Sequence, residues 1–449
     1  MDYKNKKALV CGMGKSGIAA ARLLNAHGAT VTLQDLKEKE NYEDWQTLES
    51  EGITLYTGKN PDDILEEQDL MVLSPGIPTD LPFIMRSENE LQLDVISEVE
   101  LAYRELLCPM IGITGTNGKT TTTTLVGEIM EAVYENTAVV GNIGVSFSGE
   151  VERLQKDDFA VAELSSFQLE KIKTFRPHVC AVLNISPDHL NRHKTMENYI
   201  AMKERIFENQ LDSDFCILNY DDAVCRAMAK KTKARVVFFS SKQPLADGVF
   251  LENDAIYLAE DGTKELVIAT KELQILGVHN YENVMAAVAM TLAVGVEISV
   301  IQKVLRKFSG VAHRIEYVGA VDGVNYYNDS KGTNVDAAIR GILAMERPTI
   351  LIGGGYDKGG SYDDWTSLFV GRVKQLILIG ATANAIAKSA KANGFSEISF
   401  CDTLEDAVEL AKEESQDGDA VLLSPACASW GMFDNYEQRG DVFKMCVKK

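Results

Sequence analysis

Gly112-Ile113-Thr114-Gly115-Thr116-Asn117-Gly118-Lys119-Thr120-Thr121 is the stretch of sequence that decides the fold of this chain. It lies between an apolar run typical of a strand and a stretch of helix-forming residues. A glycine-rich turn in that position lets backbone N–H groups approach phosphate oxygens, and the helix N-terminus adds positive potential. Lys119 is then placed to reach the β- and γ-phosphates of a nucleotide, and the Thr120 hydroxyl to bind Mg²⁺. Because Ile113 replaces the first glycine of the strict pattern, a capped helix N-terminus without a ligand is the alternative.

Length and composition limit what surrounds this loop. The chain has 449 residues, which corresponds to about three domains. It carries 45 Lys and Arg against 66 Asp and Glu, a net charge of −21. That balance argues against a protein that coats nucleic acid or binds an anionic membrane, because both need a basic face. A small anionic ligand is still compatible, since a single pocket can be locally positive.

The N-terminus and the cysteines predict a cytoplasmic protein. No run of about 18 apolar residues predicts a membrane span, and the first residues lack the apolar core of a signal peptide. The 8 cysteines are scattered without a Cys-x-x-Cys pair, a pattern typical of buried thiols in a reducing compartment.

A second glycine loop opens the chain. The strand-like run 7–11 leads into Gly12-x-Gly14-x-x-Gly17, a helical stretch follows, and Asp35 comes at the end of the next strand. This pattern matches the dinucleotide-binding fingerprint and indicates a phosphate near a helix N-terminus, without specifying nicotinamide. The alternative is close helix–strand packing with no ligand. Another short strand, 70–73, ends in Ser74-Pro75-Gly76.

Alternating strand and helix signals predict an α/β fold with parallel sheets in three domains. Ser97 has the position of an N-cap, with Glu98 and Glu100 in the first turn of a helix that runs to Leu107. We therefore expect a Rossmann-like domain at 1–97, a P-loop-type mononucleotide-binding α/β domain at 98–311, and a Rossmann-like domain at 312–449. In the middle domain, 283–294 is an Ala-rich helix.

Polar residues that follow apolar strands are the other candidates for chemistry. Glu163 ends one strand, where a carboxylate is well placed to hold Mg²⁺. His189 lies in a loop after another strand, although a loop histidine is more often a surface residue. In the last third, polar clusters occur at 313–316, 328–334, 353–360 and 423–430. An ordinary exposed turn is the alternative for 313–316 and 328–334, whereas 353–360 and 423–430 follow apolar strands, where α/β sheets place ligands. We treat Arg439-Gly440-Asp441, which is similar to an adhesion tripeptide, as chance.

Several of these motifs occur together, and in the same order, in the Mur ligases, the ATP-dependent amide-forming enzymes of peptidoglycan precursor synthesis. The Thr-Gly-Thr-Asn-Gly-Lys-Thr loop resembles the loop that the whole superfamily shares. Three narrower blocks, 163–169, 328–334 and 424–429, resemble the member that adds D-glutamate. The resemblance spans essentially the whole chain and implies three domains that bind UDP, ATP and the amino acid. It implies addition of D-glutamate to UDP-N-acetylmuramoyl-L-alanine through an acyl phosphate.

The resemblance also implies roles for individual residues. It places the UDP substrate at Gly14, Ser16, Gly17, Asp35, Ser74, Pro75, Gly76 and Asn142. It places ATP at Gly115, Thr116, Asn117, Gly118, Lys119, Thr120, Thr121, Asn280, Asn283, Arg314, Asp329 and Lys331. It places D-glutamate at Thr333, Lys358, Ser429 and Tyr436, where the family usually has Phe at the last position. The family often has Thr-Arg after the acidic residue, whereas Leu36-Lys37 follow Asp35 here.

Metal ions and one modified lysine complete the implied site. The resemblance assigns catalysis to Lys119, Glu163, His189 and Lys203, and two Mg²⁺ ions to Thr120, Glu163, His189 and Lys203. The family carries a carbamylated lysine in the block that matches Lys203, although an exposed helical lysine is the ordinary reading of that position. A carbamate is an anion and binds a hard cation, which an ammonium does not.

Other functions stay open from the sequence alone. They are a sibling ligase or a folylpolyglutamate-type ligase, an NAD-dependent oxidoreductase, and a non-catalytic nucleotide-binding regulator. We expect a monomer with no nucleic-acid or membrane partner.

Overall fold

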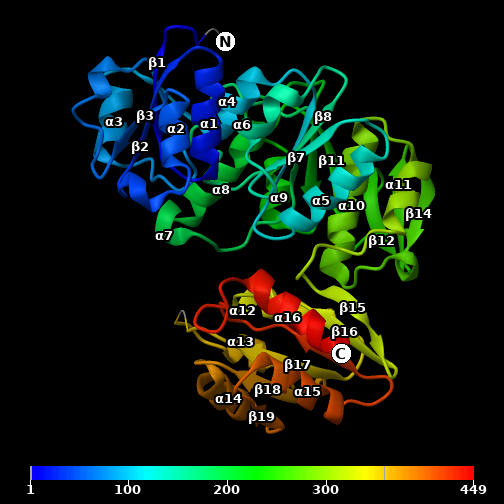
Figure 1. Ribbon diagram of the computed structural model, residues 1–449. Helices are drawn as coiled ribbons and strands as arrows, with labels where there is room; N and C mark the ends of the chain where they lie inside the picture. Colours follow the sequence, from blue (N-terminus) through cyan, green and yellow to red (C-terminus); the bar gives the residue numbers. More distant parts are fainter. Residues whose placement is uncertain (1–2, 358, 449) are drawn as a thin grey trace. The chain divides into compact units, whose positions relative to one another are not determined.

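The computed structural model describes residues 3–357 and 359–448 (Figure 1). The chain forms two compact units, one of residues 1–267 with 283–304, and one of residues 268–282 with 305–449. The described residues form three β-sheets with helices between the strands. Two of the sheets belong to the first unit and one to the second. No helix among the described residues has the length and apolar character to cross a membrane.

The first sheet has the strand order β3-β2-β1-β4-β5, and all its paired strands are parallel. Its strands are β1 (Lys7–Cys11), β2 (Thr30–Asp35), β3 (Thr54–Thr57), β4 (Leu70–Leu73) and β5 (Asp94–Ser97). The helices of this segment are α1 (Lys15–Ala26), α2 (Trp45–Ser50), α3 (Pro82–Asn89) and α4 (Glu98–Glu105). The order reverses at β1, so the loops after β1 and β4 flank the crevice where such sheets bind ligands.

Close packing of α1 against β1 explains one glycine of the first loop. A Cβ at Gly17 would lie 1.8 Å from the carbonyl oxygen of Gly12, so only glycine fits. The Ser74 hydroxyl donates to the same Gly12 carbonyl at 3.1 Å. The loop after β1 and the turn after β4 are therefore held together at the carboxyl edge of the sheet.

The second sheet, also in the first unit, has the order β14-β13-β12-β11-β10-β9-β6-β8-β7. In this order, all neighbouring strands from β12 to β7, with β6 among them, pair in parallel. The β12–β13 pair is antiparallel. Its strands are β6 (Met110–Thr114), β7 (Thr137–Gly141), β8 (Phe159–Glu163), β9 (Val179–Val182), β10 (Phe215–Asn219), β11 (Arg235–Ser240), β12 (Gly248–Glu252), β13 (Ala255–Glu260) and β14 (Thr263–Ala269). The helices of this stretch are α5 (Lys119–Glu131), α6 (Phe147–Glu150), α7 (Leu190–His193), α8 (Met196–Glu204) and α9 (Ala223–Met228), followed in sequence by α10 (Val278–Ala293) and α11 (Ile298–Leu305).

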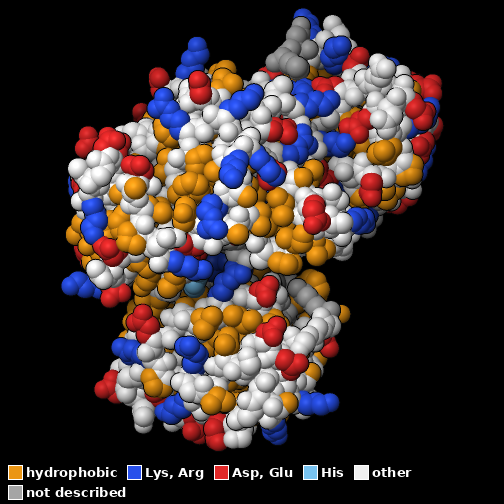
Figure 2. Space-filling view, turned by 180° about the vertical axis from the view of Figure 1, so that it is seen from behind, with side chains coloured by type: hydrophobic (Ala, Val, Ile, Leu, Met, Phe, Trp, Pro, Cys, Tyr) orange, Lys and Arg blue, Asp and Glu red, His pale blue; other side chains and the backbone are white. Residues whose placement is uncertain are grey.

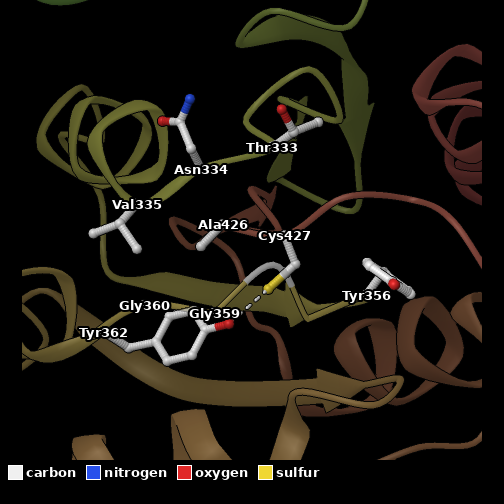
Figure 3. Close-up of a pocket in the computed structure, with 9 residues that line it drawn as sticks. All are labelled: Thr333, Asn334, Val335, Tyr356, Gly359, Gly360, Tyr362, Ala426 and Cys427. Atoms are coloured by element: carbon white, nitrogen blue, oxygen red, sulfur yellow. Dashed lines mark hydrogen bonds between the residues drawn. The ribbon is translucent and has the colours of Figure 1, made fainter. Parts of the chain in front are cut away.

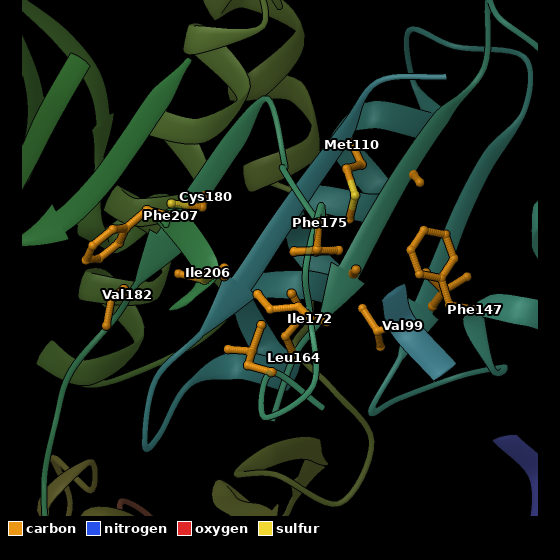
Figure 4. Close-up of a cluster of buried hydrophobic side chains, with 14 of the residues drawn as sticks. Val99, Met110, Phe147, Leu164, Ile172, Phe175, Cys180, Val182, Ile206 and Phe207 are labelled. Carbon is orange, nitrogen blue, oxygen red and sulfur yellow. The ribbon is translucent and has the colours of Figure 1, made fainter. Parts of the chain in front are cut away.

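A continuous apolar core holds the parallel centre of this sheet. Every residue of β6 and β8 is buried, as expected for strands covered on both faces. Figure 4 shows side chains of this core, with Leu164, Ile172 and Phe175 gathered against the strands. Burying one such side chain contributes about 1.5–3 kcal/mol, so the core keeps the carboxyl ends of β6, β8 and β9 in place.

The third sheet, in the second unit, has the order β15-β16-β20-β17-β18-β19. The β15–β16 pair is antiparallel and the other pairs are parallel. Its strands are β15 (Glu316–Val321), β16 (Val324–Asn328), β17 (Thr349–Gly354), β18 (Val373–Ile379), β19 (Ile398–Phe400) and β20 (Ala420–Leu423). Its helices are α12 (Val335–Leu343), α13 (Asp363–Thr366), α14 (Ala383–Ala392), α15 (Leu404–Glu414) and α16 (Tyr436–Lys448).

Most of the predicted elements are present, with two informative differences. The α/β fold class is confirmed, and Ser97 caps α4 by accepting a hydrogen bond from the Glu100 amide. The predicted helix 283–294 starts too late, because α10 runs from Val278 to Ala293, and the helix predicted to reach Leu107 ends at Glu105. Glu100 on α4 is buried, where it accepts from the backbone amides of residues 173–175 and from Arg104. This long-range anchoring has no signature in a local sequence window.

Candidate active site

The phosphate loop of the first sheet brings together the residues assigned to a UDP substrate. Gly14 caps α1, and Ser16 and Gly17 lie in its first turn. The Ser74-Pro75-Gly76 turn follows β4 and is attached to Gly12 through the Ser74 hydroxyl. Asn142, which is also assigned to the UDP substrate, follows β7 in the second sheet and donates to Glu163 Oε1 at 2.8 Å.

Asp35 organises the first loop. Its carboxylate accepts from the Met13 amide at 2.9 Å and from the Lys37 amide at 3.0 Å. Partial burial acts to raise the pKa of Asp35, but these donors and the Tyr42 hydroxyl outweigh it and lower the pKa. Asp35 is therefore an anion that shapes the loop. Leu36, next in sequence, is 63% exposed.

The P-loop lies at the carboxyl end of β6. Gly118 has a left-handed φ of 83°, and a Cβ there would lie 2.2 Å from Oδ1 of Asn283. The Thr116 hydroxyl lies 3.0 Å from the Tyr199 hydroxyl, and the Asn117 amide donates to the Asn184 side chain at 2.9 Å. Lys119 Nζ donates to the carbonyl oxygens of Gly115 and Thr116, both at 2.9 Å. Thr120 and Thr121 open α5 directly after Lys119.

Glu163 ends β8 beside this loop and is only 1% exposed. Its Oε1 accepts from the Asn142 side chain at 2.8 Å. Its Oε2 is buried and has no hydrogen-bond partner among the described residues. A buried carboxylate oxygen without a donor is costly unless a cation or ligand meets it. Glu163 is thus a suitable ligand for a hard cation.

Lys203 is buried, whereas a lysine on a helix is ordinarily expected to be exposed. Its side chain is only 1% exposed. Its Nζ donates to the Gly115 carbonyl at 2.7 Å, the oxygen that Lys119 also contacts. Burial, and then the nearby Lys119 ammonium, hold the pKa of Lys203 well below its usual value. The amine therefore loses its proton more readily than a surface lysine.

His189 lies at the surface beside this cluster. It precedes α7 with a left-handed φ of 52°, and its ring centroid is 4.9 Å from that of Phe167. The buried His193 lies 2.8 Å, through Nε2, from the Ser166 hydroxyl. Within 3–357 and 359–448, no three His, Cys, Asp or Glu residues converge to form a metal site. A metal held here would depend on other ligands, such as a hydroxyl, a modified lysine or a bound phosphate.

The second unit holds the other residues assigned to ATP. Asp329 and Lys331 lie in the turn after β16, and the Ser424 hydroxyl donates to Asp329 Oδ2 at 2.7 Å. Lys331 Nζ lies 5.4 Å from the centre of the Tyr436 ring. Nε of Arg314 is buried without a hydrogen-bond partner in the described part of the chain. The Asn280 side chain donates to the Leu276 carbonyl at 2.8 Å.

Asp329 should make stability depend on pH. Burial raises its pKa from 3.8 to about 7, so the folded state binds the proton more tightly than the unfolded chain. The free energy of unfolding is therefore expected to fall as pH rises from about 4 to about 7, by about 4 kcal/mol in total. Asp329→Asn should remove this loss, as measured by urea unfolding at pH 4 to 8. The exposed Asp402→Asn is the control, and an identical pH slope in Asp329→Asn and the unmodified chain would contradict the assignment.

A small cavity of about 100 Å³ opens beside this turn (Figure 3). Thr333 lines it, with Tyr356 and Tyr362 at its sides. The Cys427 sulfur lies 3.5 Å from the Tyr362 hydroxyl. Of the other residues assigned to D-glutamate, Ser429 and Tyr436 do not line this cavity, and Lys358 lies outside the described residues.

Arg439 is a buried residue next to the candidate site that the sequence did not indicate. It is 1% exposed, and its guanidinium donates to the Ser330 hydroxyl at 2.9 Å, the Ser330 carbonyl at 2.7 Å and the Cys427 carbonyl at 3.1 Å. It therefore joins the turn that bears Asp329 to the loop that lines the cavity. No local sequence signal indicates this burial, because Ser330 lies 109 residues away from Arg439 in the chain.

Comparison with known proteins decides the family. The Mur ligase MurD-like N-terminal domain matches residues 6–96, the Mur ligase middle domain residues 113–291, and the Mur ligase glutamate ligase domain residues 313–427. A protein of Lachnospira eligens named UDP-N-acetylmuramoylalanine–D-glutamate ligase is 49% identical, covering 100% of this chain and 99% of its own. One of the same name from Lachnoclostridium phytofermentans is 48% identical with the same coverage.

The chain belongs to the Mur ligase family. Mur ligases are ATP-dependent ligases, which accounts for the P-loop motif after β6. The solved structure of the Mur ligase MurF from Acinetobacter baumannii has the same fold, with a TM-score of 0.63 at 16% identity over 98% of this chain and 93% of that one. The three-domain Mur ligase fold predicted from the sequence is confirmed.

Proposed function

We propose that this Mur ligase adds D-glutamate to UDP-N-acetylmuramoyl-L-alanine, with conversion of ATP to ADP and phosphate, in cytoplasmic peptidoglycan precursor synthesis. The observation that carries the proposal is full-length identity of 46–49% to relatives that bear this activity in their names. The local geometry supports it, because one edge of the first unit holds both a P-loop and a buried carboxylate, one of whose oxygens has no hydrogen-bond partner in the described part of the chain. We further propose domain boundaries at 97/98 and 311/312, and a monomer.

Three anions must be brought together in this reaction, and the chain itself is acidic. Acidic and basic side chains are both spread over the face in Figure 2. Positive charge must therefore come from local groups. In the first unit these are Lys119 and the N-termini of α1 and α5. In the second unit they are Arg314 and Lys331, with Lys358 beyond the described residues.

The first step transfers the γ-phosphoryl group of ATP to the L-alanine carboxylate and forms an acyl phosphate. We assign the ATP phosphates to residues 115–121, where Lys119 neutralises the charge that develops on the transferred group. Asn283 supports this loop, since it accepts from the Thr122 hydroxyl at 3.3 Å. Asn280, Arg314, Asp329 and Lys331 are proposed nucleotide contacts from the second unit. The UDP moiety is assigned to the loop after β1, with Asp35, the 74–76 turn and Asn142.

In the second step the amine of D-glutamate attacks the acyl phosphate, a tetrahedral intermediate forms, and phosphate leaves. We assign the amino acid to the cavity beside Thr333, together with Lys358, Ser429 and Tyr436. The cavity, at about 100 Å³, has no room for a nucleotide. The attacking amine must lose a proton, and His189 is a candidate acceptor if it is not bound to metal. Water must be kept out, because it would hydrolyse the acyl phosphate.

We propose that two Mg²⁺ ions bind near the P-loop. The fit rests on Glu163, whose Oε2 is a buried acceptor with no donor among the described residues. Thr120 would supply a hydroxyl, and His189 and Lys203 would hold the second ion. Bound Mg²⁺ supplies positive charge that offsets the phosphate and carboxylate anions.

We propose that Lys203 is carbamylated. The ammonium would lose one proton, and the neutral amine would then add carbon dioxide and lose a second, which changes the side chain overall from a cation to an anion. The low pKa that burial and Lys119 impose favours the neutral amine that this addition requires. A buried ammonium beside a second ammonium is otherwise an unfavourable arrangement.

The decisive experiment measures ADP release with ATP and UDP-N-acetylmuramoyl-L-alanine while the amino acid is varied. D-Glutamate should stimulate release, whereas L-glutamate, L-lysine and meso-diaminopimelate should not. Stimulation by one of the other amino acids would indicate a sibling ligase. No stimulation by D-glutamate would refute the proposal.

Replacing Glu163 tests the proposed metal site. Glu163→Gln keeps the size of the side chain and an acceptor for Asn142, but it removes the charge. We expect the maximal rate to fall by about a hundredfold and the Mg²⁺ concentration for half-maximal rate to rise. Glu131→Gln, an exposed carboxylate on α5, is the matched control. Unchanged Mg²⁺ dependence in Glu163→Gln would remove Glu163 from the metal site.

A further inference from the structure

One ion pair of the first unit joins loops that carry proposed site residues. Arg192 Nε donates to Glu170 Oε1 at 3.1 Å, and its Nη2 donates to Glu170 Oε2 at 2.7 Å. The two side chains are 16% and 7% exposed. Two parallel hydrogen bonds between a guanidinium and a carboxylate fix direction as well as distance. A pair of this kind holds the segments that bear it in one arrangement.

The pair also holds the chain that follows the proposed UDP turn. Arg192 Nη2 donates to the Ile77 carbonyl at 2.8 Å, and the Thr79 hydroxyl donates to Glu170 Oε2 at 2.9 Å. Ile77 directly follows Ser74-Pro75-Gly76, and its amide donates to the Ser74 carbonyl at 3.0 Å. Both partners of the ion pair therefore attach the second sheet's loops to this turn of the first sheet.

On its other side the pair lies next to the segments that carry proposed metal ligands. Arg192 lies in α7, which begins immediately after His189. Its guanidinium carbon is 4.9 Å from the centre of the Phe167 ring, and that ring is 4.9 Å from the His189 ring. Phe167 and Glu170 lie in the loop that begins at Glu163, the end of β8. Arg192 thus joins the segment that follows His189 to the loop that follows Glu163.

We propose that Glu170 and Arg192 are positioning residues that align the UDP-substrate turn with the His189 segment. The inference rests on the proposed function and goes beyond it, because neither side chain is assigned to a substrate. A misplacement of about 1 Å between reacting groups costs about a hundredfold in rate. Lysine in place of Arg192 keeps the charge but loses the fork that reaches Glu170 and Ile77 together.

A matched control lies one residue further along the chain. Lys171 Nζ donates to Glu88 in α3 at 2.6 and 2.7 Å, with side chains 20% and 26% exposed. This pair also joins the loop after β8 to the first sheet's segment, but at α3, beyond Thr79. Breaking it tests whether any ion pair between the two segments matters.

The experiment compares Arg192→Lys and Glu170→Gln with Lys171→Met and Glu88→Gln. We expect the first two to lower kcat/KM for UDP-N-acetylmuramoyl-L-alanine by about 10- to 100-fold, with KM for D-glutamate within about twofold. The two controls should keep kcat/KM within about twofold, although their melting temperatures fall by a similar amount. Hydrogen exchange of residues 74–80 should be faster in Arg192→Lys and unchanged in Lys171→Met.

Two outcomes would overturn the inference. In the first, Arg192→Lys and Glu170→Gln both keep the kcat/KM of the unmodified protein. In the second, Lys171→Met and Glu88→Gln lose as much kcat/KM as Arg192→Lys and Glu170→Gln. Failure of the proposed function is distinguishable, because the unmodified protein itself would then show no D-glutamate-dependent ADP release. Hydrogen exchange would still report whether the pair holds residues 74–80, since that measurement needs no turnover.

Discussion

Lys119→Ala is expected to lower the rate of D-glutamate-dependent ADP release by about a thousandfold. A preorganised charge at the transferred phosphoryl group contributes at this level, because its stabilisation is largest in the transition state. In the structure, Lys119 Nζ is held over its own loop by the carbonyl oxygens of Gly115 and Thr116. These two hydrogen bonds hold the Lys119 ammonium in place on the P-loop. A coupled assay of ADP release at saturating substrates measures the loss.

The UDP site should survive this change. Lys119 follows β6, whereas the proposed UDP site is formed by the loop after β1 and the 74–76 turn. Calorimetric binding of UDP should therefore be unchanged. Lys264→Ala is the matched control, since Lys264 is an exposed lysine on β14 that contacts the Tyr257 ring. Normal turnover by Lys119→Ala would end the P-loop assignment.

Lys203→Ala is expected to be inactive and to recover part of its activity when acetate is added. Truncation of a buried lysine leaves a space beside the Gly115 carbonyl, and a small carboxylate that enters it supplies the charge of the proposed carbamate. The rate of ADP release against acetate concentration should rise and saturate. Recovery would also distinguish a lost anion from general damage to the core, because acetate does not repair misfolding.

Lys203→Met is the matched control for this rescue. Methionine fills most of the space and carries no charge, so acetate should not restore its activity. In a second measurement, ¹³C-labelled carbon dioxide should give a carbamate resonance in the unmodified protein and none in Lys203→Ala. Activity of Lys203→Ala at the unmodified level, without any added acid, would show that the carbamate is not used.

Local sequence signals predicted the elements and their order well. The apolar runs at 110–113 and 215–219, the Ser97 cap and the glycine loops all correspond to observed strands, caps and turns. These features depend on residues a few positions apart, which is the range that propensity and periodicity describe. The start of α10 was missed because His279 and Asn280 have no strong helix-start signal.

Contacts between distant segments were outside that range. Burial of Lys203 depends on its position against the P-loop, 88 residues earlier in the chain. Arg439 reaches Ser330 across 109 residues, and Arg192 reaches Ile77 across 115. No window of local sequence contains both partners, so a helical lysine or arginine is predicted to be exposed until the fold is known.

Resemblance to the Mur ligases supplied the candidate site residues, and the sequence by itself determined the α/β class and the two glycine loops. It did so because a glycine turn between a strand and a helix is a local structure with a fixed chemical consequence. The tertiary structure alone decided which of those residues are buried, which are paired, and which keep an unsatisfied hydrogen-bonding atom. It left one Glu163 oxygen without a hydrogen-bond partner among residues 3–357 and 359–448, lowered the pKa of Lys203 and joined the 74–79 segment to α7 through Arg192. The physical reason is that solvation and charge pairing depend on neighbours in space, which only the packing of the sheets and loops supplies.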